Sequence, residues 1–283
     1  MFNHIAIAGL GLICGSLARD IRELGLSATI TGFGRNPARL KKACEMGLID
    51  AWHTDFAPGI AQADLIIIGT PVRLIPKQVH EMLPHVKQGA VITDVGSVKT
   101  AIVEQIEPAM TPGVFFIGGH PIAGTENSGF ESAVRGLFKN RACVLTPTGT
   151  TDPYALKRLT EFWTAVGARV VQMDIQTHDM IFAGISHLPH MVAFSLVNAV
   201  TDMENFENQI LQYSAGGFRD FTRIAASDPV MWRDIALMNR DHILNALSFF
   251  EKSLGALKQS IAAGDASSIE QFFKKSHDTR RTI

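Results

Sequence analysis

The chain opens with a short apolar run, HIAIAG at positions 4–9, which ends in Gly9 and is followed by Gly11. The helical pattern LARDIREL comes next. A glycine turn between a strand and a helix can hold a pyrophosphate, because Gly9 permits the tight turn and Gly11 lets the phosphate approach the helix N-terminus. Cys14 occupies the third position of the pattern, where a small residue keeps helix and strand close, so this departure costs some packing room. The turn therefore predicts a dinucleotide-binding βαβ unit.

Apolar, strand-like runs alternate with helical patterns through the first part of the chain. The predicted strands are HIAIAG, ATITGF, ADLIIIGT, GAVITDV, VFFIGG, RACVLTP and ARVVQM. This alternation predicts an α/β fold with a Rossmann-type, doubly wound parallel sheet. After about Asp174 no clear strand follows, and the remaining segments carry helical spacing. We predict a dinucleotide-binding domain over residues 1–173 and an all-helical domain over residues 174–283.

Composition narrows the setting in which the protein works. The 283 residues are 46% hydrophobic with a net charge of -1, which gives no reason to expect nucleic acid or an anionic membrane as a partner. The three cysteines are far apart and form no CxxC pair, so neither a disulfide framework nor a zinc knuckle is indicated. The N-terminus lacks a signal peptide pattern, and the apolar stretch MVAFSLVNAV is too short to span a bilayer. We expect a cytoplasmic protein.

The end of the second strand bears on the choice of cofactor. NAD-binding domains place an acid there for the ribose hydroxyls, but this chain has Gly34 and Arg35. An arginine beside a glycine suits a 2′-phosphate, so NADP is slightly favoured over NAD. In the alternative interpretation Arg35 is a solvated charge that stacks on adenine, and NAD is used. The predicted cofactor-binding residues are Gly9, Gly11, Leu12, Ile13, Gly34, Arg35, Thr70, Pro71 and Val72.

Three loops are expected at the carboxyl edge of the sheet, where open α/β sheets bind ligands: GTPVRLIP, DVGSVK and GGHPIAGTENSG. Thr70 and Pro71 form a stiff turn on the nicotinamide side, and Ser97 offers a hydroxyl. His120 stands among glycines and a proline rather than on a helix face, so its imidazole is free to point into the crevice. Its ordinary pKa suits proton transfer near neutral pH.

Six motifs together resemble the prephenate/arogenate dehydrogenase family of tyrosine biosynthesis: GLGLICGS, GTPV, DVGSVK, GGHPIAGTENSG, SHLPH and GGFRDFTRIAASDPVMWRDI. The resemblance spans nearly the whole chain. It implies that prephenate loses a hydride from the ring carbon bearing its hydroxyl while the ring carboxylate leaves as carbon dioxide, which gives 4-hydroxyphenylpyruvate and a reduced nicotinamide. It also implies an intertwined homodimer formed by the helical domain.

The resemblance further implies roles for individual residues. His120 accepts the proton of the ring hydroxyl, and Ser97 orients the hydroxyl or the imidazole. Arg223 binds a substrate carboxylate, with Arg219 on the same helix face as a second basic residue. The remaining predicted substrate-binding residues are His190, Thr125, Glu126, Gly216 and Trp232. His187 and His190 are three apart, but no third ligand is evident and we predict no metal site.

Three alternatives stay open at this point. Arogenate differs from prephenate by an amino in place of a keto group, and a single residue can decide between them. A hydroxyacid or imine reductase shares the architecture but usually relies on a helical lysine or aspartate in its second domain. A nicotinamide-sensing regulator without catalysis would need no placed His120, Ser97 and arginine pair.

Overall fold

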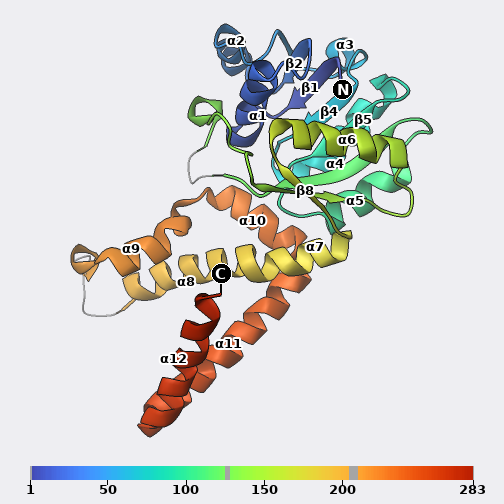
Figure 1. Ribbon diagram of the computed structural model, residues 1–283. Coiled ribbons are helices and arrows are strands. Elements are labelled where there is room, and N and C mark those ends of the chain that lie inside the picture. Colours follow the sequence, from blue (N-terminus) through green and yellow to red (C-terminus); the bar gives the residue numbers. More distant parts are fainter. Residues whose placement is uncertain (1, 125–127, 204–209, 283) are drawn as a thin grey trace.

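The computed structural model describes residues 2–124, 128–203 and 210–282, and it folds into an α/β part followed by a helical part (Figure 1). The sheet carries eight strands in the order β3-β2-β1-β4-β5-β6-β7-β8. Their bounds are β1 His4–Ala8, β2 Thr29–Phe33, β3 Ala51–His53, β4 Leu65–Ile68, β5 Val91–Asp94, β6 Phe115–Pro121, β7 Ala142–Thr146 and β8 Arg169–Gln172. The predicted Rossmann-type fold is confirmed, with a sheet that is mostly parallel.

Two features of the sheet differ from the prediction. β3 was not predicted, because a three-residue strand is too short to show a pattern. β7 runs antiparallel to β6, although the sheet was expected to be parallel throughout. No long crossover helix joins these two strands in the described residues, so the chain turns back instead of crossing over.

Helices cover both faces of the sheet, and alternate strand residues face the two cores. In β1, Ile5 and Ile7 enter one core, whereas Ala6 and Ala8 enter the other. The first core includes side chains from α1 and α6, and the second includes side chains from α4 and α5. The helix bounds are α1 Leu12–Glu23, α2 Pro37–Glu45, α3 Ala57–Ile60, α4 Ile75–Met82, α5 Thr100–Ile106 and α6 Pro153–Val166.

The segment between β6 and β7 is tied to the first two helices. The backbone N–H of Val134 donates to Ser16 Oγ at 2.9 Å, and that of Gly136 donates to Asp20 Oδ1 at 2.8 Å, both on α1. Glu131 forms ion pairs with Arg39 at 3.0 Å and with Lys42 at 3.4 Å, both on α2. This segment therefore packs with α1 and α2 as one unit.

The helical part begins where Asp174 caps a helix by accepting from the N–H of Thr177 at 2.9 Å. Its helices are α7 Ile175–Phe182, α8 Leu188–Thr201, α9 Gly216–Thr222, α10 Pro229–Met238, α11 Arg240–Ala263 and α12 Ala266–Arg280. A π-helical segment, Ala183–His187, joins α7 to α8 just before Pro189. Trp232 and Ile235 of α10 belong to the same core as α4 and α5, so the two parts pack directly together.

The helical run Ile175–Thr201 has 27 residues, and its most apolar 18-residue window has a mean hydropathy of 1.6, so by length and composition alone it is long and apolar enough to cross a membrane. The stretch MVAFSLVNAV alone is too short to span a bilayer, but it is only part of this longer helical run, so its length does not exclude a membrane-spanning helix. Core helices of soluble proteins pass the same test. This run also carries His178, Asp179 and His187, which are buried and hydrogen-bonded to other parts of the fold.

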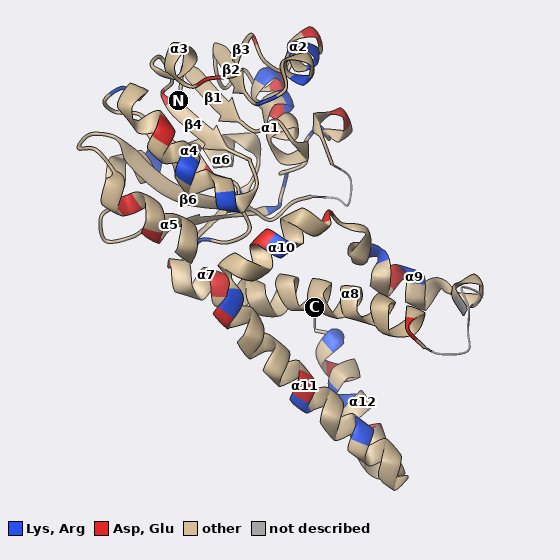
Figure 2. Ribbon diagram, turned by 180° about the vertical axis from the view of Figure 1, so that it is seen from behind, with Lys and Arg blue, Asp and Glu red and all other residues tan. Residues whose placement is uncertain are grey.

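Much of the helical part leaves apolar side chains exposed. α11 and α12 form a hairpin that extends away from the rest of the chain (Figure 1). α8 carries no Lys, Arg, Asp or Glu (Figure 2). α11 buries only Ile243. Large exposed apolar side chains on the last three helices are Val230, Met231, Leu237, Leu244, Phe249, Leu254, Ile261 and Phe273.

Candidate active site

The glycine turn has the geometry that a bound pyrophosphate requires. Gly9 has a φ of +89°, and a Cβ there would lie 2.7 Å from the backbone nitrogen of Thr70, so no other residue fits without a shift. A Cβ on Gly11 would meet no atom within 4 Å, which leaves open space beside the N-terminus of α1. Leu12 and Ile13 begin that helix. These residues fit a dinucleotide diphosphate.

Cys14 is accommodated by a glycine on the neighbouring strand end. Its side chain is buried, and a Cβ on Gly69 would come within 2.3 Å of Cys14 Sγ. Gly69 follows β4 and directly precedes Thr70. The larger residue on α1 is thus matched by the absence of a side chain opposite it.

A cavity of about 380 Å³ opens at the ends of β1 and β2. The Arg39 guanidinium lies 5.0 Å from the centroid of the Phe130 ring and is held there by Glu131. Gly34 and Arg35, which the sequence predicts to be cofactor-binding residues, both line the cavity. The lining residues are Leu10, Phe33, Gly34, Arg35, Asn36, Arg39, Leu40 and Phe130. An adenosine between apolar side chains and guanidinium groups fits this lining.

Thr70, Pro71 and Val72 lie at the carboxyl end of β4. Thr70 packs against Gly9 and donates its hydroxyl to Gln78 Oε1 at 2.6 Å. Pro71 precedes a 3₁₀ turn in which Val72 is buried. The turn is stiff, as the sequence indicated, and it borders the glycine turn.

A buried ion pair fixes the next loop, at the end of β5. Lys99 Nζ contacts Asp94 Oδ2 and donates to the carbonyl of Gly119 at 2.8 Å. Asp94 also accepts from the N–H groups of Gly96 at 2.8 Å and Gly119 at 3.1 Å. Because Gly119 directly precedes His120, this pair fixes the backbone from which that imidazole projects.

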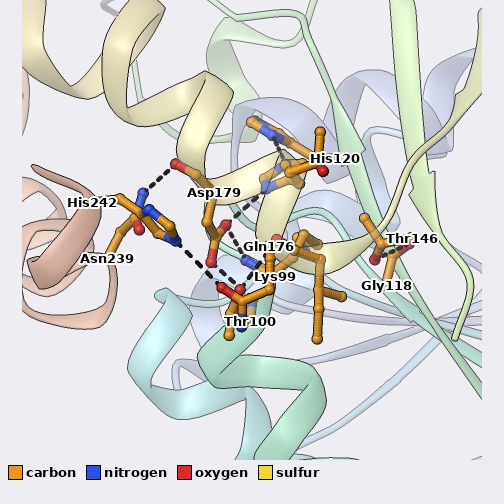
Figure 3. A network of polar contacts seen from close by, with 12 residues as sticks. Lys99, Thr100, Gly118, His120, Thr146, Gln176, Asp179, Asn239 and His242 are labelled. Carbon is orange, nitrogen blue, oxygen red and sulfur yellow. Dashed lines mark hydrogen bonds and ion pairs between the residues drawn. The ribbon is translucent and has the colours of Figure 1, made fainter. Parts of the chain in front are cut away.

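His120 lies near the end of β6, and its Nδ1 is 2.9 Å from Nε2 of His178 on α7. His178 Nδ1 is in turn 2.8 Å from Asp179 Oδ1. Burial lowers the pKa of His120 well below its ordinary value, and the positive charge of Lys99 adds to this effect. The imidazole is therefore neutral at neutral pH and able to accept a proton. Figure 3 shows His120 beside the polar network of α7.

Ser97 lies in the same loop as Lys99, but its hydroxyl makes no hydrogen bond to His120. The predicted role of Ser97, to orient the substrate hydroxyl or the imidazole, therefore remains a prediction. His187 lies beside the backbone of Ser97, and burial lowers the pKa of His187 to about 4. Its Nδ1 is 3.1 Å from Asn239 Nδ2, which makes His187 a supporting residue of the core.

His190 and Trp232 stack with their ring centroids 3.7 Å apart. Burial lowers the pKa of His190, and the nearby positive charge of Arg223 lowers it further. Arg219 is in the last turn of α9 and donates to Ser214 Oγ at 3.2 Å, whereas Arg223 begins the 3₁₀ turn Arg223–Ala226. The sequence predicts that the two arginines share one helix face. They do not lie on one continuous α-helix, because α9 ends at Thr222.

Gly216 is the first residue of α9, and a Cβ there would meet no atom within 4 Å. Its predicted substrate-binding role remains a prediction. Thr125 and Glu126, predicted at the pocket entrance, lie outside the described residues.

Two family models match consecutive parts of the chain. The nucleotide-binding domain of prephenate dehydrogenase matches residues 17–172, and the dimerization domain of prephenate dehydrogenase matches residues 174–275. The chain belongs to the prephenate dehydrogenase family. It is accordingly an oxidoreductase with a domain for a nicotinamide cofactor.

Relatives in this family align over almost the whole chain. Cyclohexadienyl dehydrogenase of Zymomonas mobilis is 34% identical over 100% of this chain and 97% of its own length. Prephenate dehydrogenase of Bacillus subtilis is 36% identical over 99% of this chain and 76% of its own length. The crystal structure of Aquifex aeolicus prephenate dehydrogenase with hydroxyphenyl propionate and NAD+ superimposes with a TM-score of 0.95 at 37% identity, covering 100% of this chain and 99% of that one.

Sequence reasoning about this member of the prephenate dehydrogenase family missed His178, Asp179 and Asn239. The adjacent pair His178 and Asp179 was visible, but it lies within a helical pattern and adjacent side chains on a helix do not face each other. Only the packing of α7 against α5 brings the pair to His120. Among the described residues, no group of three or more His, Cys, Asp or Glu side chains could hold a metal ion.

Proposed function

We propose that the protein oxidises prephenate to 4-hydroxyphenylpyruvate and carbon dioxide. The observation that carries this proposal is the neutral imidazole of His120 at the carboxyl edge of the sheet, next to the helix that continues to His190. The charge of Arg223 acts on His190, so a cation also belongs to this group of residues. A proton acceptor and a carboxylate-binding cation are the two groups that this reaction needs.

The chain's own residues then divide the work. His120 accepts the proton of the ring hydroxyl, and Arg223 binds a carboxylate of the dianionic substrate, with His190 and Trp232 as a stacked wall beside it. Ser97 contributes a hydroxyl near the reacting end of the substrate. A bound nicotinamide would supply the hydride acceptor, and His120 returns its proton to the ring oxygen as the ring becomes aromatic. Loss of carbon dioxide makes the ring aromatic, which makes the step strongly downhill and leaves mainly positioning to the protein.

An activity grid with two substrates and two cofactors tests this proposal. Prephenate and arogenate are each incubated with NADP and NAD, and the absorbance of the reduced cofactor is followed. Turnover of prephenate supports the proposal, and turnover of arogenate alone would replace it by the arogenate reaction. Arogenate dehydrogenase of Synechocystis, with a TM-score of 0.83 at 32% identity over 99% of each chain, makes this second outcome a specific alternative. No reduced cofactor with either substrate would exclude both.

NADP is the cofactor we propose, and the space around Gly34 supports this choice. A Cβ at Gly34 would meet only side-chain atoms of Leu40, at 3.4 Å or more, so packing does not require a glycine there. There is space for an acidic side chain at position 34, so its absence bears on the charge of the cavity and not on packing. Arg35 and Arg39 line the cavity, where guanidinium groups suit a 2′-phosphate.

Two opposite substitutions at the cavity separate NADP from NAD. We expect Arg35→Ser to raise KM for NADP about tenfold or more with little change for NAD, because it removes a charge-assisted contact to the 2′-phosphate. Gly34→Asp should lower KM for NAD and raise KM for NADP, since it restores the acid that binds ribose hydroxyls. Steady-state kinetics with both cofactors measure this, with Lys41→Ser as the control for loss of a basic residue on α2. A wild-type preference for NAD would contradict the assignment.

We further propose a homodimer formed by the helical part. Only 22% of the most apolar window in Ile175–Thr201 is buried, and no residue of α12 in the described chain is buried. Apolar side chains at this density on α11 need a partner surface, which a second copy supplies. We also propose that the protein works in the cytoplasm, with this apolar helix covered by protein.

The dimer predicts a mass in solution of twice the 30.8 kDa chain. Phe249 is 69% exposed in the single chain, so Phe249→Glu should place charges at the interface and shift the protein towards the monomer. Sedimentation equilibrium near 1 micromolar protein, the order at which a stable dimer stays associated, measures both masses. Glu251→Gln on the same helix is the control. A monomeric wild type would overturn the proposal.

A further inference from the structure

The hydrogen-bond chain from Asp179 through His178 to His120 determines which nitrogen of His120 carries its proton. The Asp179 carboxylate accepts from the N–H of Lys99 at 2.8 Å and from that of Thr100 at 2.9 Å, at the start of α5. Burial acts against the charged carboxylate, but the hydrogen bond from His178 and these two N–H contacts, seen in Figure 3, outweigh it, so the pKa of Asp179 is lowered. A charged carboxylate can only accept hydrogen bonds.

His178 is therefore restricted to one tautomer. Its Nδ1 is 2.8 Å from Asp179 Oδ1, so Nδ1 must carry a proton and donate it. Burial lowers the pKa of His178, which keeps the ring neutral. A neutral imidazole has one proton, and hence Nε2 of His178 is left as an acceptor. The opposite tautomer would set a lone pair against the carboxylate.

The same reasoning then applies to His120. Its Nδ1 is 2.9 Å from the accepting Nε2 of His178, so Nδ1 of His120 carries the proton. Since His120 is also neutral, its Nε2 has the free lone pair. If Nε2 then takes a proton, His120 still donates from Nδ1, and the charge of Asp179 stabilises the imidazolium through His178.

We propose that His178 and Asp179 are positioning residues that hold His120 in the Nδ1–H tautomer, so that Nε2 is its proton-accepting atom. This proposal rests on the proposed role of His120 in the reaction. Asn239 supports the arrangement, since its Nδ2 donates to the backbone carbonyl of Asp179 at 2.8 Å. The network thus joins α5, α7 and the end of α10 around one imidazole.

The tautomer can be measured without any turnover. In the full-length protein labelled with ¹⁵N-histidine, long-range ¹H–¹⁵N correlation spectra distinguish protonated from unprotonated ring nitrogens, and the His120→Asn variant identifies the His120 signals. We expect protonated Nδ1 and unprotonated Nε2 in the wild type. A wild-type His120 that carries its proton on Nε2 would overturn the proposal, whatever substrate the enzyme uses.

Two substitutions at His178 test its role in turnover. His178→Leu removes the acceptor, so we expect a mixture of His120 tautomers and a kcat lowered at least about tenfold, with both KM values within about twofold. His178→Gln keeps an oxygen acceptor on a chain of similar reach and should recover most of the loss. His242→Gln is the control, since this half-buried histidine lies outside the network and its Nε2 is 3.4 Å from Gln176 Oε1. Equal losses in the Leu and Gln variants would reduce His178 to a packing residue. If His178→Leu fails to fold, the wild-type spectrum and the Gln variant still decide.

Discussion

Replacing His120 by asparagine will lower kcat about a thousandfold and leave the affinity for the cofactor unchanged. General-base catalysis contributes about 10²- to 10⁴-fold, and His120 is the neutral imidazole at the carboxyl edge of the sheet. The glycine turn that holds the pyrophosphate is on a different strand, so cofactor binding does not depend on this side chain. Turnover is measured from reduced cofactor, and affinity from the fluorescence of bound reduced cofactor.

The exposed residue His277 provides the control, and His277→Asn should behave as the wild type. The lowered pKa of His120 adds a test by pH. A base works only when it is deprotonated. As the pH falls past 6.5, the ordinary pKa of histidine, kcat/KM of the wild type should therefore stay level, and it should fall only in more acid solution. A His120→Asn variant that keeps more than a tenth of wild-type turnover would refute the role of His120 as the base.

Replacing Arg223 by methionine will raise KM for the substrate about a hundredfold, with a smaller effect on kcat. Loss of one partner from a hydrogen-bonded charge pair costs about 2–5 kcal/mol, and a hundredfold change is about 3 kcal/mol. Methionine keeps much of the side-chain length but carries no charge. Arg223→Lys should lie between the two, because lysine keeps the charge and loses the planar fork that binds a carboxylate bidentately.

Arg281→Met, near the C-terminus, controls for the loss of one positive charge and should leave KM unchanged. Arg219→Met should raise KM less than Arg223→Met, since Arg219 is exposed and held by Ser214. KM within about threefold of the wild type in Arg223→Met would show that this guanidinium does not bind the substrate.

Most of the sheet was predictable because its strands are buried and apolar on both faces. β4, with four isoleucine and leucine residues, could be predicted from its composition alone. β3 could not be predicted, because it has only three residues. The direction of β7 also escaped prediction, since a strand's pattern of apolar residues is the same whether it pairs parallel or antiparallel. The boundary after residue 173 remains a prediction, although the last strand ends at Gln172 and the next helix starts at Ile175.

The candidate site was predictable where one loop carries its own signal. The glycine turn and His120 have unusual neighbours in the sequence, so each could be identified locally. His178 and Asp179 reach the site only because α7 packs on α5. The hydrogen bond between Lys99 and Asp179 joins residues that are 80 positions apart in the sequence. For Ser97, the sequence places its loop at the same edge of the sheet as that of His120 but does not fix which side chain meets the imidazole, so its role remains a prediction. No local pattern encodes such a pairing.

The anchoring of the β6–β7 segment to α1 and α2 sets a limit for domain shuffling between homologous enzymes. Its partners Ser16, Asp20, Arg39 and Lys42 all lie in the first 42 residues, whereas the segment follows His120. A chimaera joined anywhere between these two regions would pair helices from one parent with a loop from the other and lose these bonds unless both parents share them. The smallest exchangeable cassette for transplanting coenzyme selectivity therefore extends from the N-terminus through Thr146.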